Sequence, residues 1–406
     1  MKGLVQAYRA LTDIYLNGDW IGEAVKKQGA ALYENKGSYR LVHGVIEHEF
    51  LYEYRIARLA EKPPKSSVKI LLKMGMYLLD FSDLPDYTAV NEIAETAKKV
   101  GKGGVCGFLN AVLRRYAAAE KNLNPVDPDE SLSASANLPL WLVKRYRVEW
   151  GDEAAKRLTS PRTALSHIRP ALSFGKKALG EILSNRGIDC KETAYGFYIG
   201  AVGEISDLLK EGKATVMSYG SAEVCAAVPH PAGKVLDLCA APGGKTVFLA
   251  EKFGAPVISC DLYPHRVELI RAYAERMKVS TVLPTQADGR ILREEWRNAF
   301  SVVLLDAPCS GFGSLSSQPD IVLHRTEKDL DAIVETQREL LAVAGAYVEK
   351  GGAIVYATCT DLPSEDGDVV RDFLASRGDY ILEKEKYTDP EEGGGDRYYY
   401  AILRRK

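Results

Sequence analysis

The sequence predicts a protein of three parts: an all-helical N-terminal domain, a small α+β middle segment and a C-terminal α/β domain with a parallel sheet. Three observations lead to this prediction. The chain has 406 residues, which is more than one compact core usually contains. Up to about residue 120, apolar residues recur every three or four positions, as in amphipathic helices. From Lys234 onward, short apolar runs alternate with helical stretches, as in a doubly wound sheet.

The helical domain is predicted over residues 1–125. Within it, Val68, Leu71, Leu72 and Met76 would share one face of a helix. Residues 126–137 contain Pro128 and little that could be buried, so we expect a linker there. Residues 138–230 are only weakly patterned and are predicted to form the small α+β segment.

The C-terminal domain is predicted over residues 231–406. Apolar runs that begin near residues 235, 257, 282, 302 and 353 have the length of buried strands. In sheets of this type, ligands bind at the carboxyl ends of the strands. The residues that follow these runs are therefore the candidates for a functional site.

The composition indicates a folded cytoplasmic protein. Hydrophobic residues make up 46% and charged residues 27%, and the net charge of -2 provides no overall field that attracts nucleic acid. Seven cysteines without a CxxC pair argue against a disulfide framework and against a zinc site, and they fit a reducing compartment. The start of the chain lacks the apolar core of a signal peptide, and no run of about twenty apolar residues predicts a membrane span.

The first candidate site follows the strand at Val235. The segment Cys239-Ala-Ala-Pro-Gly-Gly-Lys-Thr246 has small residues that would let the backbone approach a ligand before the next helix begins. The next strand ends in Asp261, where a carboxylate commonly binds ribose hydroxyls, and Asp288 follows the third strand. This arrangement predicts a pocket for a ligand that carries adenosine.

Several interpretations of this turn compete. A dinucleotide site would require GxGxxG, which does not follow the strand, so NAD is disfavoured. A P-loop would match if Cys239 were glycine, which leaves an ATPase as an alternative. A tight turn without a ligand is another. S-adenosylmethionine is favoured, because its carboxylate and amine suit the segment from Asp237 to Gly244 and its ribose suits Asp261.

Two cysteines form the second candidate site. Cys309 follows a strand that ends in Asp306, and Cys359 follows the strand that begins at Ala353. These would be the fourth and fifth strands, which are neighbours in a methyltransferase-type sheet, so both thiols would face one cleft with Asp306 between them and the cofactor. The alternative is that each cysteine is a small buried apolar residue, and we expect this of the other five.

Two thiols beside a methyl donor suit the methylation of a pyrimidine. A thiolate can add to carbon 6 of the base, which makes carbon 5 nucleophilic toward a methyl sulfonium. The carboxyl group of Asp306 could stabilise charge that develops on ring nitrogen 3. Carbon 5 must then lose its proton and the enzyme must be released, a separate step that could use the second thiol. This reasoning does not decide which cysteine has which role.

The segments Leu238–Thr246, Asp306–Gly311 and Thr358–Cys359 closely resemble motifs of the Sun-type RNA (cytosine-5) methyltransferases. The resemblance implies a Rossmann-like fold and S-adenosylmethionine as cofactor. It also implies that Cys359 is the nucleophile, that Cys309 assists release and that Asp306 is catalytic. The cofactor-binding residues that it implies are Cys239, Ala240, Ala241, Pro242, Gly243, Gly244, Lys245, Asp261, Arg266, Asp288 and Asp306.

The N-terminal domain is similar to the NusB family in residues 40–45, 71–79, 90–92 and 107–114. Together, the two resemblances imply that the substrate is a cytosine in 16S ribosomal RNA. We expect the protein to be a monomer. The chain departs from the methyltransferase pattern at 216–222, at Thr360, at 363–368 and at 396–400. These departures keep a second function open, that of a non-catalytic RNA-binding assembly factor.

Basic residues in the helical domain are candidates for phosphate contacts. They are Lys98, Lys99, Lys102, Arg114, Arg115 and Lys121. The alternative is an ordinary solvated face of the helices. Because carbon 6 of a paired cytosine is stacked within a helix, the target base must be single-stranded or flipped out.

Overall fold

The computed structural model of the protein describes residues 3–29, 32, 36–119, 123–159, 165–388, 394 and 396–406. The chain divides into two compact units. The helical unit comprises residues 1–159 and 318–325. The second unit comprises residues 160–317 and 326–406 and is named the catalytic unit because it contains the cysteines predicted to react. Within the described residues, no helix is long and apolar enough to cross a membrane.

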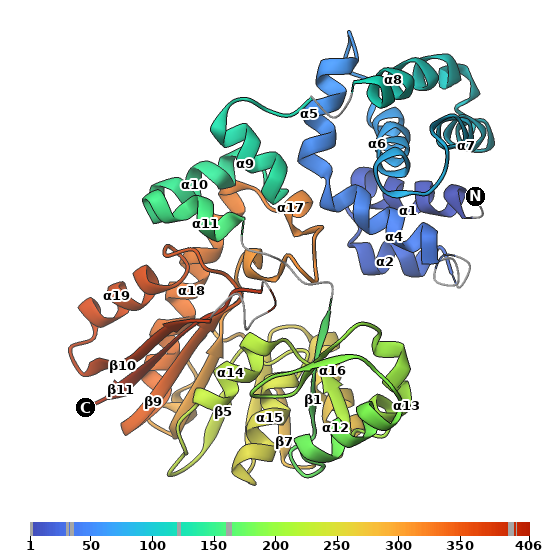
Figure 1. Cartoon of the computed structure of the whole chain (residues 1–406). Helices are drawn as coiled ribbons and strands as arrows, with labels where there is room; N and C mark the ends of the chain where they lie inside the picture. Colours follow the sequence, from blue (N-terminus) through green and yellow to red (C-terminus); the bar gives the residue numbers. More distant parts are fainter. Residues whose placement is uncertain are drawn as a thin grey trace. The chain divides into compact units, whose positions relative to one another are not determined.

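The helical unit is built around α6, whose residues pack among α1, α4, α7 and α8 (Figure 1). Gly75 on α6 permits a close approach to α8, because a Cβ atom there would lie 2.5 Å from Cδ1 of Leu113. The prediction of an all-helical N-terminal domain is confirmed. Its described helices are α1 (Leu4–Asn17), α2 (Ile21–Lys27), α4 (Lys36–Glu47), α5 (Glu49–Leu59), α6 (Ser66–Phe81), α7 (Asp86–Lys99), η1 (Gly103–Val105) and α8 (Cys106–Ala118).

The predicted linker at 126–137 is wrong in its conformation, because α9 (Pro128–Ala136) occupies most of it. Asp127 caps this helix by accepting hydrogen bonds from the N–H groups of Asp129 and Glu130, both at 2.9 Å. Pro128 stands at the first position, where a helix needs no N–H donor. At the other end, Asn137 adopts the left-handed conformation and donates to the carbonyl of Ile46 at 2.8 Å.

The helical unit therefore extends beyond its predicted end at residue 125. After α9 come α10 (Leu140–Trp150), η2 (Gly151–Glu153) and α11 (Ala154–Leu158), and α17 (Ile321–His324) also belongs to this unit. The predicted middle segment 138–230 is thus divided, since its first helices pack with the helical unit. The apolar pattern of these short helices is too weak to predict which of the two units they pack against.

The remainder of the middle segment contains a small antiparallel sheet with the strand order β2-β3-β1-β4. Helices α12 and α13 share a core with this sheet. The bounds are β1 (Ser166–Pro170), α12 (Lys176–Asn185), β2 (Cys190–Glu192), β3 (Phe197–Ile199), η3 (Val202–Ile205), α13 (Ser206–Lys210), β4 (Ala214–Val216) and α14 (Tyr219–Ala227).

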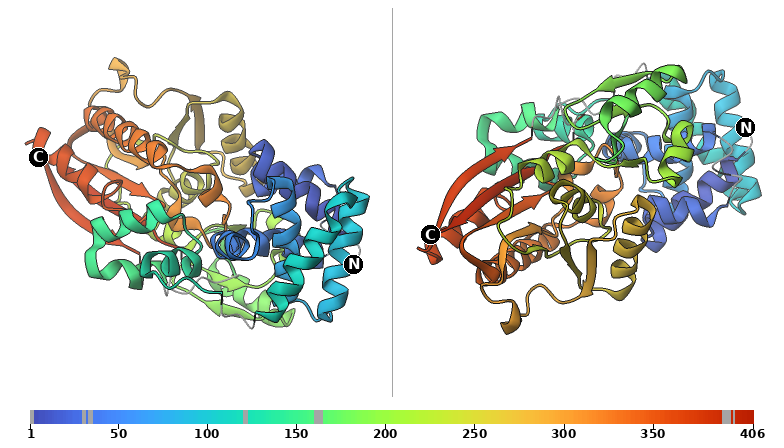
Figure 2. Two further views of the ribbon diagram at one scale, coloured as in Figure 1. Left: turned by 90° about the horizontal axis from the view of Figure 1, so that it is seen from above. Right: turned by 90° about the horizontal axis from the view of Figure 1, so that it is seen from below.

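The C-terminal sheet has seven strands in the order β10-β11-β9-β8-β5-β6-β7. Five neighbouring strands of this sheet, β9, β8, β5, β6 and β7, are parallel. All five begin where the sequence predicts them or a few residues earlier. Alternate strand residues face two cores: α14, α15 and α16 cover one face and α18 and α19 the other (Figure 2). The bounds are β5 (Val235–Asp237), α15 (Gly244–Phe253), β6 (Val257–Asp261), α16 (Pro264–Met277), β7 (Val282–Gln286), η4 (Glu294–Trp296), β8 (Phe300–Asp306), η5 (Phe312–Ser314), α18 (Glu327–Tyr347), β9 (Val348–Thr358) and α19 (Gly367–Ser376).

The last two strands, β10 (Tyr380–Tyr387) and β11 (Tyr399–Arg405), are antiparallel to their neighbours and were not predicted. β10 is an edge strand with mostly exposed, charged side chains, so it lacks an apolar run. β11 inserts between β10 and β9. This insertion brings the segment that precedes β11 to the carboxyl end of β9, where Cys359 lies.

Candidate active site

The turn between β5 and α15 forms the first part of the site. Gly243 has a φ of +108°, which a residue with a side chain rarely adopts. A Cβ atom at Gly243 would also lie 3.1 Å from Cα of Ile270, so the turn packs directly on α16. The N–H of Ala240 donates to the carbonyl of Cys260 at 2.7 Å and ties the turn to the end of β6.

Asp237, at the end of β5, supplies a buried carboxylate beneath this turn. One of its oxygens accepts a hydrogen bond from Thr246 at 2.6 Å. The other, Oδ1, is buried and has no hydrogen-bond partner among the residues that the structure describes. Burial raises the pKa of Asp237 to about 7. A buried acceptor without a partner costs about 1–3 kcal/mol, so a ligand that donates an N–H there gains affinity.

Asp261, at the end of β6, is the second buried carboxylate. It accepts a hydrogen bond from the N–H of Ala241 at 3.3 Å and lies 3.5 Å from the guanidinium of Arg266. Because these contacts are long, the carboxylate oxygens of Asp261 can still accept hydrogen bonds from ribose hydroxyls. Asp288 is half-buried and is held by Arg290 at 2.8 Å. The glycine turn, the orphaned oxygen of Asp237 and the carboxylate of Asp261 together fit S-adenosylmethionine.

Lys245 links this turn to the second candidate site. Its Nζ donates to Oδ2 of Asp306, at the end of β8, at 2.6 Å. Burial alone would lower the pKa of Lys245, but the carboxylate of Asp306 raises it above its ordinary value, so the ammonium group is charged. Lys245 was predicted with the cofactor residues, and the structure joins it to the residue predicted to contact the base.

Cys309 and Cys359 lie together at the ends of adjacent parallel strands, with their sulfur atoms 2.9 Å apart. The N–H of Cys359 also donates to the sulfur of Cys309 at 3.3 Å. The bond with Cys309 lowers the pKa of Cys359 against the opposing effect of burial, and the ammonium of Lys245 adds to the lowering. The same bond and burial raise the pKa of Cys309 well above its usual range. Of the two thiols, Cys359 is therefore the one that ionises more readily.

Sequence reasoning missed Glu365, a fully buried residue that holds the loop of Cys309. Its carboxylate accepts hydrogen bonds from the N–H and the hydroxyl of Ser310, at 2.7 and 2.6 Å. Gln337 donates to the same carboxylate at 3.2 Å and to the carbonyl of Pro308 at 3.0 Å. Burial raises the pKa of Glu365, although these hydrogen bonds oppose the shift. The residues on both sides of Cys309 are thus fixed from behind.

Tyr398 was also missed, because its position depends on the unpredicted strand β11. The pairing of β11 with β9 brings Tyr398 beside Cys359. The Nζ of Lys245 lies 5.8 Å from the centroid of the Tyr398 ring, and Ser218 donates to its hydroxyl at 2.8 Å. The signal for both missed residues lay in 363–368 and 396–400, where the chain departs from the family pattern.

Four other cysteines of the catalytic unit lie in or against its cores and behave as small apolar residues: Cys190, Cys225, Cys239 and Cys260. Burial raises the pKa of Cys225, Cys239 and Cys260, which keeps these thiols protonated. Cys239, predicted among the cofactor residues, lies in the turn itself and packs against the core on the α18 side of the sheet.

Five of the basic residues predicted to contact phosphates lie on α7, the following loop and α8. Lys98 forms an ion pair with Glu95 at 2.6 Å, and Arg115 donates to the carbonyl of Leu59 at 3.2 Å. Lys99 and Arg114 are exposed. Lys121 lies outside the described residues.

Comparison with known proteins identifies the family. Residues 224–400 match the family described as 16S rRNA methyltransferase RsmB/F, and residues 4–118 match the NusB family. Ribosomal RNA small subunit methyltransferase B of Xylella fastidiosa is 30% identical over 396 residues, which cover 88% of this chain and 89% of the relative. The chain belongs to the 16S rRNA methyltransferase RsmB/F family.

Other relatives agree with this assignment. The protein named probable ribosomal RNA small subunit methyltransferase B in Bacillus subtilis is 29% identical over 88% of this chain and 84% of its own length. Among solved structures, PH0851 has a TM-score of 0.82 at 22% identity and covers 99% of both chains. NSun6 from Pyrococcus horikoshii, solved with SFG, has a TM-score of 0.57 at 20% identity and covers 66% of this chain and 98% of its own. At these identities, the two structures show that the fold is shared.

Membership of the RsmB/F family confirms several predictions. The chain is an S-adenosylmethionine-dependent rRNA (cytosine-5) methyltransferase with a NusB-family N-terminal domain. The matched residues 224–400 include the cofactor turn, Asp306 and both cysteines. The alternative of a P-loop ATPase is thereby excluded. In a P-loop, Lys245 would contact a phosphate, whereas here it donates a hydrogen bond to Asp306.

Proposed function

We propose that this chain methylates carbon 5 of one cytosine in 16S rRNA and that Cys359 forms the covalent bond to the base. The contact between the two sulfur atoms at 2.9 Å is the observation that carries the proposal, because it places the thiol with the lowered pKa beside a second thiol at the ends of two adjacent strands. The NusB-family domain supports RNA as the substrate.

The reaction begins when the thiolate of Cys359 attacks carbon 6 of the cytosine and forms a carbon–sulfur bond. Electron density then moves toward ring nitrogen 3 and carbon 5. The pair of Lys245 and Asp306 stands beside Cys359. Asp306 holds the ammonium of Lys245 in place, and a second N–H of that ammonium donates to nitrogen 3 as its negative charge develops. When bound in the turn between β5 and α15, S-adenosylmethionine supplies the methyl group that carbon 5 accepts.

Cys309 completes the reaction in this proposal. Once Cys359 is bonded to carbon 6, it no longer accepts the hydrogen bond that raises the pKa of Cys309. Cys309 then ionises more readily and removes the proton from carbon 5. The electrons of the carbon–hydrogen bond re-form the double bond between carbons 5 and 6, and the bond to Cys359 breaks. Glu365 keeps the loop of Cys309 in place through both steps.

The residues implied by the resemblance have separate tasks. We assign the amine of S-adenosylmethionine to Asp237, its ribose to Asp261 and its adenine side to the loop of Asp288, with Arg266 supporting Asp261. The remaining turn residues supply backbone contacts: Cys239, Ala240, Ala241, Pro242, Gly243 and Gly244. We further propose a cytoplasmic monomer, since one chain supplies both cysteines, Asp306 and Lys245, and the described cysteines are free thiols.

The test uses the purified protein and its Cys309→Ala variant, each with S-adenosylmethionine and unmodified small-subunit ribosomal RNA. We expect methyl transfer by the parent protein. In the variant we expect a covalent RNA adduct on denaturing gels, because the base that removes the carbon 5 proton is gone. A Cys309→Ala/Cys359→Ala variant is the control and should form no adduct.

Two outcomes would contradict the proposal. An adduct that persists in the double variant would assign the nucleophile to another residue. If neither methyl transfer nor an adduct is seen while the cofactor is bound and the RNA is intact, the alternative of a non-catalytic RNA-binding factor is favoured.

A further inference from the structure

The ring of Tyr398 lies against the ammonium group of Lys245 in the catalytic unit. The Nζ atom of Lys245 is over the ring, 5.8 Å from its centroid, and Tyr398 is 7% exposed. An aromatic ring attracts a cation that lies over its face within about 6 Å, and the attraction is stronger when both groups are shielded from water. Tyr398 therefore contributes to the placement of the same ammonium group that Asp306 binds.

Two contacts from different segments limit how the ammonium group of Lys245 can turn. Such a group has three N–H donors on a long, flexible stem. Asp306 accepts one of them at 2.6 Å, and the ring of Tyr398 faces the group from the segment that precedes β11. In the proposed reaction, another N–H of the group donates to nitrogen 3 of the cytosine. The two contacts together keep that N–H in one direction.

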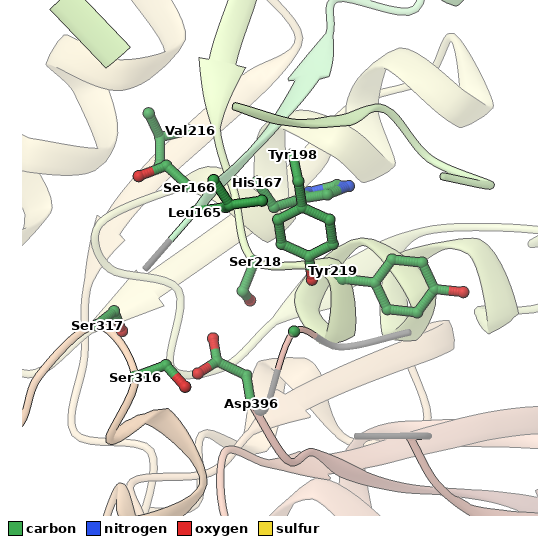
Figure 3. A pocket seen from close by; sticks show the side chains of 11 residues that line it. Leu165, Ser166, His167, Tyr198, Val216, Ser218, Tyr219, Ser316, Ser317 and Asp396 are labelled. Carbon is green, nitrogen blue, oxygen red and sulfur yellow. The ribbon is translucent and has the colours of Figure 1, made fainter. Parts of the chain in front are cut away.

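Ser218 holds the outer end of the Tyr398 ring. Its hydroxyl donates to the hydroxyl oxygen of Tyr398 at 2.8 Å, and its own oxygen accepts from the N–H of Ser221 at 3.2 Å. The second contact makes Ser218 the N-terminal cap of α14, which fixes its side chain at the start of that helix. Figure 3 shows the side chain of Ser218 directed toward the segment of Asp396, two residues before Tyr398. The Tyr398 hydroxyl is thus tied to the start of a helix.

The backbone and the inner end of the same side chain are held as well. The hydroxyl of Thr388 accepts from the N–H of Tyr398 at 2.9 Å, and the N–H of Thr388 donates to the carbonyl of Tyr398 at 2.8 Å. Gly220 leaves room for the ring, since a Cβ atom there would lie 2.3 Å from Cδ2 of Tyr398. Burial raises the pKa of the Tyr398 hydroxyl to about 12, so the ring is neutral near pH 7. Tyr398 is therefore a neutral group that is fixed at both ends of its side chain.

The residues of this contact come from two segments in which the chain departs from the methyltransferase pattern. Ser218 and Gly220 lie in 216–222, and Tyr398 lies in 396–400. The hydrogen bond between Ser218 and Tyr398 joins these distant segments directly. Two departures that meet at one contact beside Lys245 are explained by one shared role there.

We propose that Tyr398 is a positioning residue for methylation, which holds the ammonium of Lys245 in the direction that meets the cytosine. Ser218 fixes the ring in turn, through the hydroxyl group of Tyr398. The ring acts through Lys245 and does not itself react. This inference rests on the proposed function, because it assigns an N–H of Lys245 to the base.

The experiment measures how fast the covalent RNA adduct forms in the Cys309→Ala protein, where the adduct should accumulate. Each further change is introduced into that protein, which is mixed in excess with S-adenosylmethionine and unmodified small-subunit ribosomal RNA and followed over time on denaturing gels. For Tyr398→Leu, we expect adduct formation to slow by about 3- to 30-fold, as for the loss of a shielded contact between a cation and a ring. The affinity for RNA, measured by filter binding, should stay the same.

The change Lys245→Met distinguishes positioning from a structural role. Without the ammonium group there is nothing for the ring to hold, so Tyr398→Leu should slow adduct formation no further in the Lys245→Met protein. A purely structural role of the ring would slow adduct formation by the same factor with and without Lys245, and that result would overturn the proposal.

Further variants test how the ring is held. Tyr398→Phe and Ser218→Ala each remove the hydrogen bond but keep the face of the ring, so each should slow adduct formation by a smaller factor. Both changes together should have no larger effect than either alone, and additive effects would contradict the tie between the ring and Ser218. The matched control is Tyr380→Leu, at a buried tyrosine of β10 whose hydroxyl donates to the carbonyl of Gly345 at 2.9 Å. It should leave the rate of adduct formation unchanged.

Failure of this inference can be distinguished from failure of the proposed function. If the Cys309→Ala protein forms an adduct at a rate that Tyr398→Leu does not change, the positioning role is disproved and the covalent mechanism stands. If no adduct forms at all, thermal denaturation of the protein without ligands still tests the contact. The losses in Tm for Lys245→Met and Tyr398→Leu should then add up to more than the loss for the double variant, and additive losses would disprove the contact.

Discussion

One buried cluster of the helical unit and two buried carboxylates of the catalytic unit hold their charged side chains in different ways. In the helical unit, Lys73 is 2% exposed and its ammonium lies 2.7 Å from both Glu49 and Glu53. In the catalytic unit, Asp237 and Glu365 are 0% exposed and are bonded to neutral hydroxyl and amide groups. The first arrangement neutralises each charge with an opposite one, and the second surrounds a carboxylate with dipoles.

The consequence appears in the direction of the pKa shifts. Burial alone would raise the pKa of Glu53, but Lys73 and Lys69 lower it below its ordinary value. For Asp237 and Glu365, burial prevails and the pKa is raised. The paired charges around Lys73 therefore serve stability. At Asp237 and Glu365, the fold retains carboxylates at an energetic cost, in positions where a ligand or a reacting loop requires them.

The largest effect is expected for the thiolate itself. Cys359→Ala removes the atom that bonds to carbon 6, so methyl transfer should fall by about 10⁴-fold or more. The affinity for S-adenosylmethionine should change little, because Cys359 is not part of the turn between β5 and α15. Radiolabelled methyl transfer and isothermal titration calorimetry measure the two quantities. A variant that retains a tenth of the activity would contradict the assignment.

The next effect tests the paired charges of the helical unit. Lys73→Met leaves Glu49 buried without its cation, which should lower the free energy of unfolding by about 3–5 kcal/mol. The additional change Glu49→Gln should restore part of this loss. Lys98→Met, which breaks an exposed pair with Glu95, is the matched control and should cost less than about 1 kcal/mol. Urea denaturation followed by circular dichroism measures all three, and equal losses for Lys73→Met and Lys98→Met would show that the buried pair has no special role.

The third effect concerns pH. An aspartate has a pKa near 3.8 when unfolded, whereas Asp237 in the folded protein has a pKa of about 7. Between these values the unfolded chain loses the proton and the folded protein keeps it, so the stability contributed by the protonated carboxyl is lost as pH rises from about 4 to 7. The change is of the order of 4 kcal/mol, since each pKa unit corresponds to about 1.4 kcal/mol.

Unfolding free energies of the parent and Asp237→Asn measured between pH 5 and 8 test this expectation. The variant cannot ionise and should show a flatter profile over this range. S-adenosylmethionine carries an amine that favours the ionised carboxylate, so its binding to the parent near pH 7 should release a proton. Calorimetry in buffers of different ionisation enthalpy detects that release. Parallel pH profiles for parent and variant would contradict the raised pKa.

The smallest effect is expected for the support behind Cys309. Glu365→Gln keeps the shape of the side chain but replaces one acceptor by a donor that faces the N–H or hydroxyl of Ser310. Stability should fall by about 1–3 kcal/mol, and kcat should fall because the loop of Cys309 is no longer held. The matched control is Glu383→Gln, at an exposed residue of β10 that pairs with Arg404. An unchanged kcat in Glu365→Gln would remove this residue from the positioning of Cys309.

The parts of the site that the sequence predicted are those encoded locally. The glycine turn after Val235 and the cysteines at two strand ends are each visible within a dozen residues, and the parallel sheet brings them together by a general rule. Glu365 and Tyr398 were not predictable in this way. Their roles depend on which distant segment they meet: the loop at Ser310 for one, and the end of β9 for the other.

Local signals can also be misjudged. Pro128 predicts a linker at 126–137 because proline breaks helices, but the same residue begins a helix when an aspartate such as Asp127 caps it. The extent of the helical unit could not be predicted from local patterns. The contact that joins α9 to this unit is the hydrogen bond from Asn137 to Ile46, and these two residues are far apart in the sequence.

Gly313 is the point where three segments of the catalytic unit meet. Its N–H donates to the carbonyl of Cys359 at 3.0 Å, and its carbonyl accepts from the N–H of Arg397 at 2.8 Å. A side chain would not fit at this position, because a Cβ atom on Gly313 would lie 1.9 Å from the carbonyl oxygen of Arg397 and 2.8 Å from that of Cys359. A single methyl group at residue 313 would therefore disturb the loop after β8, the end of β9 and the segment before β11 at once.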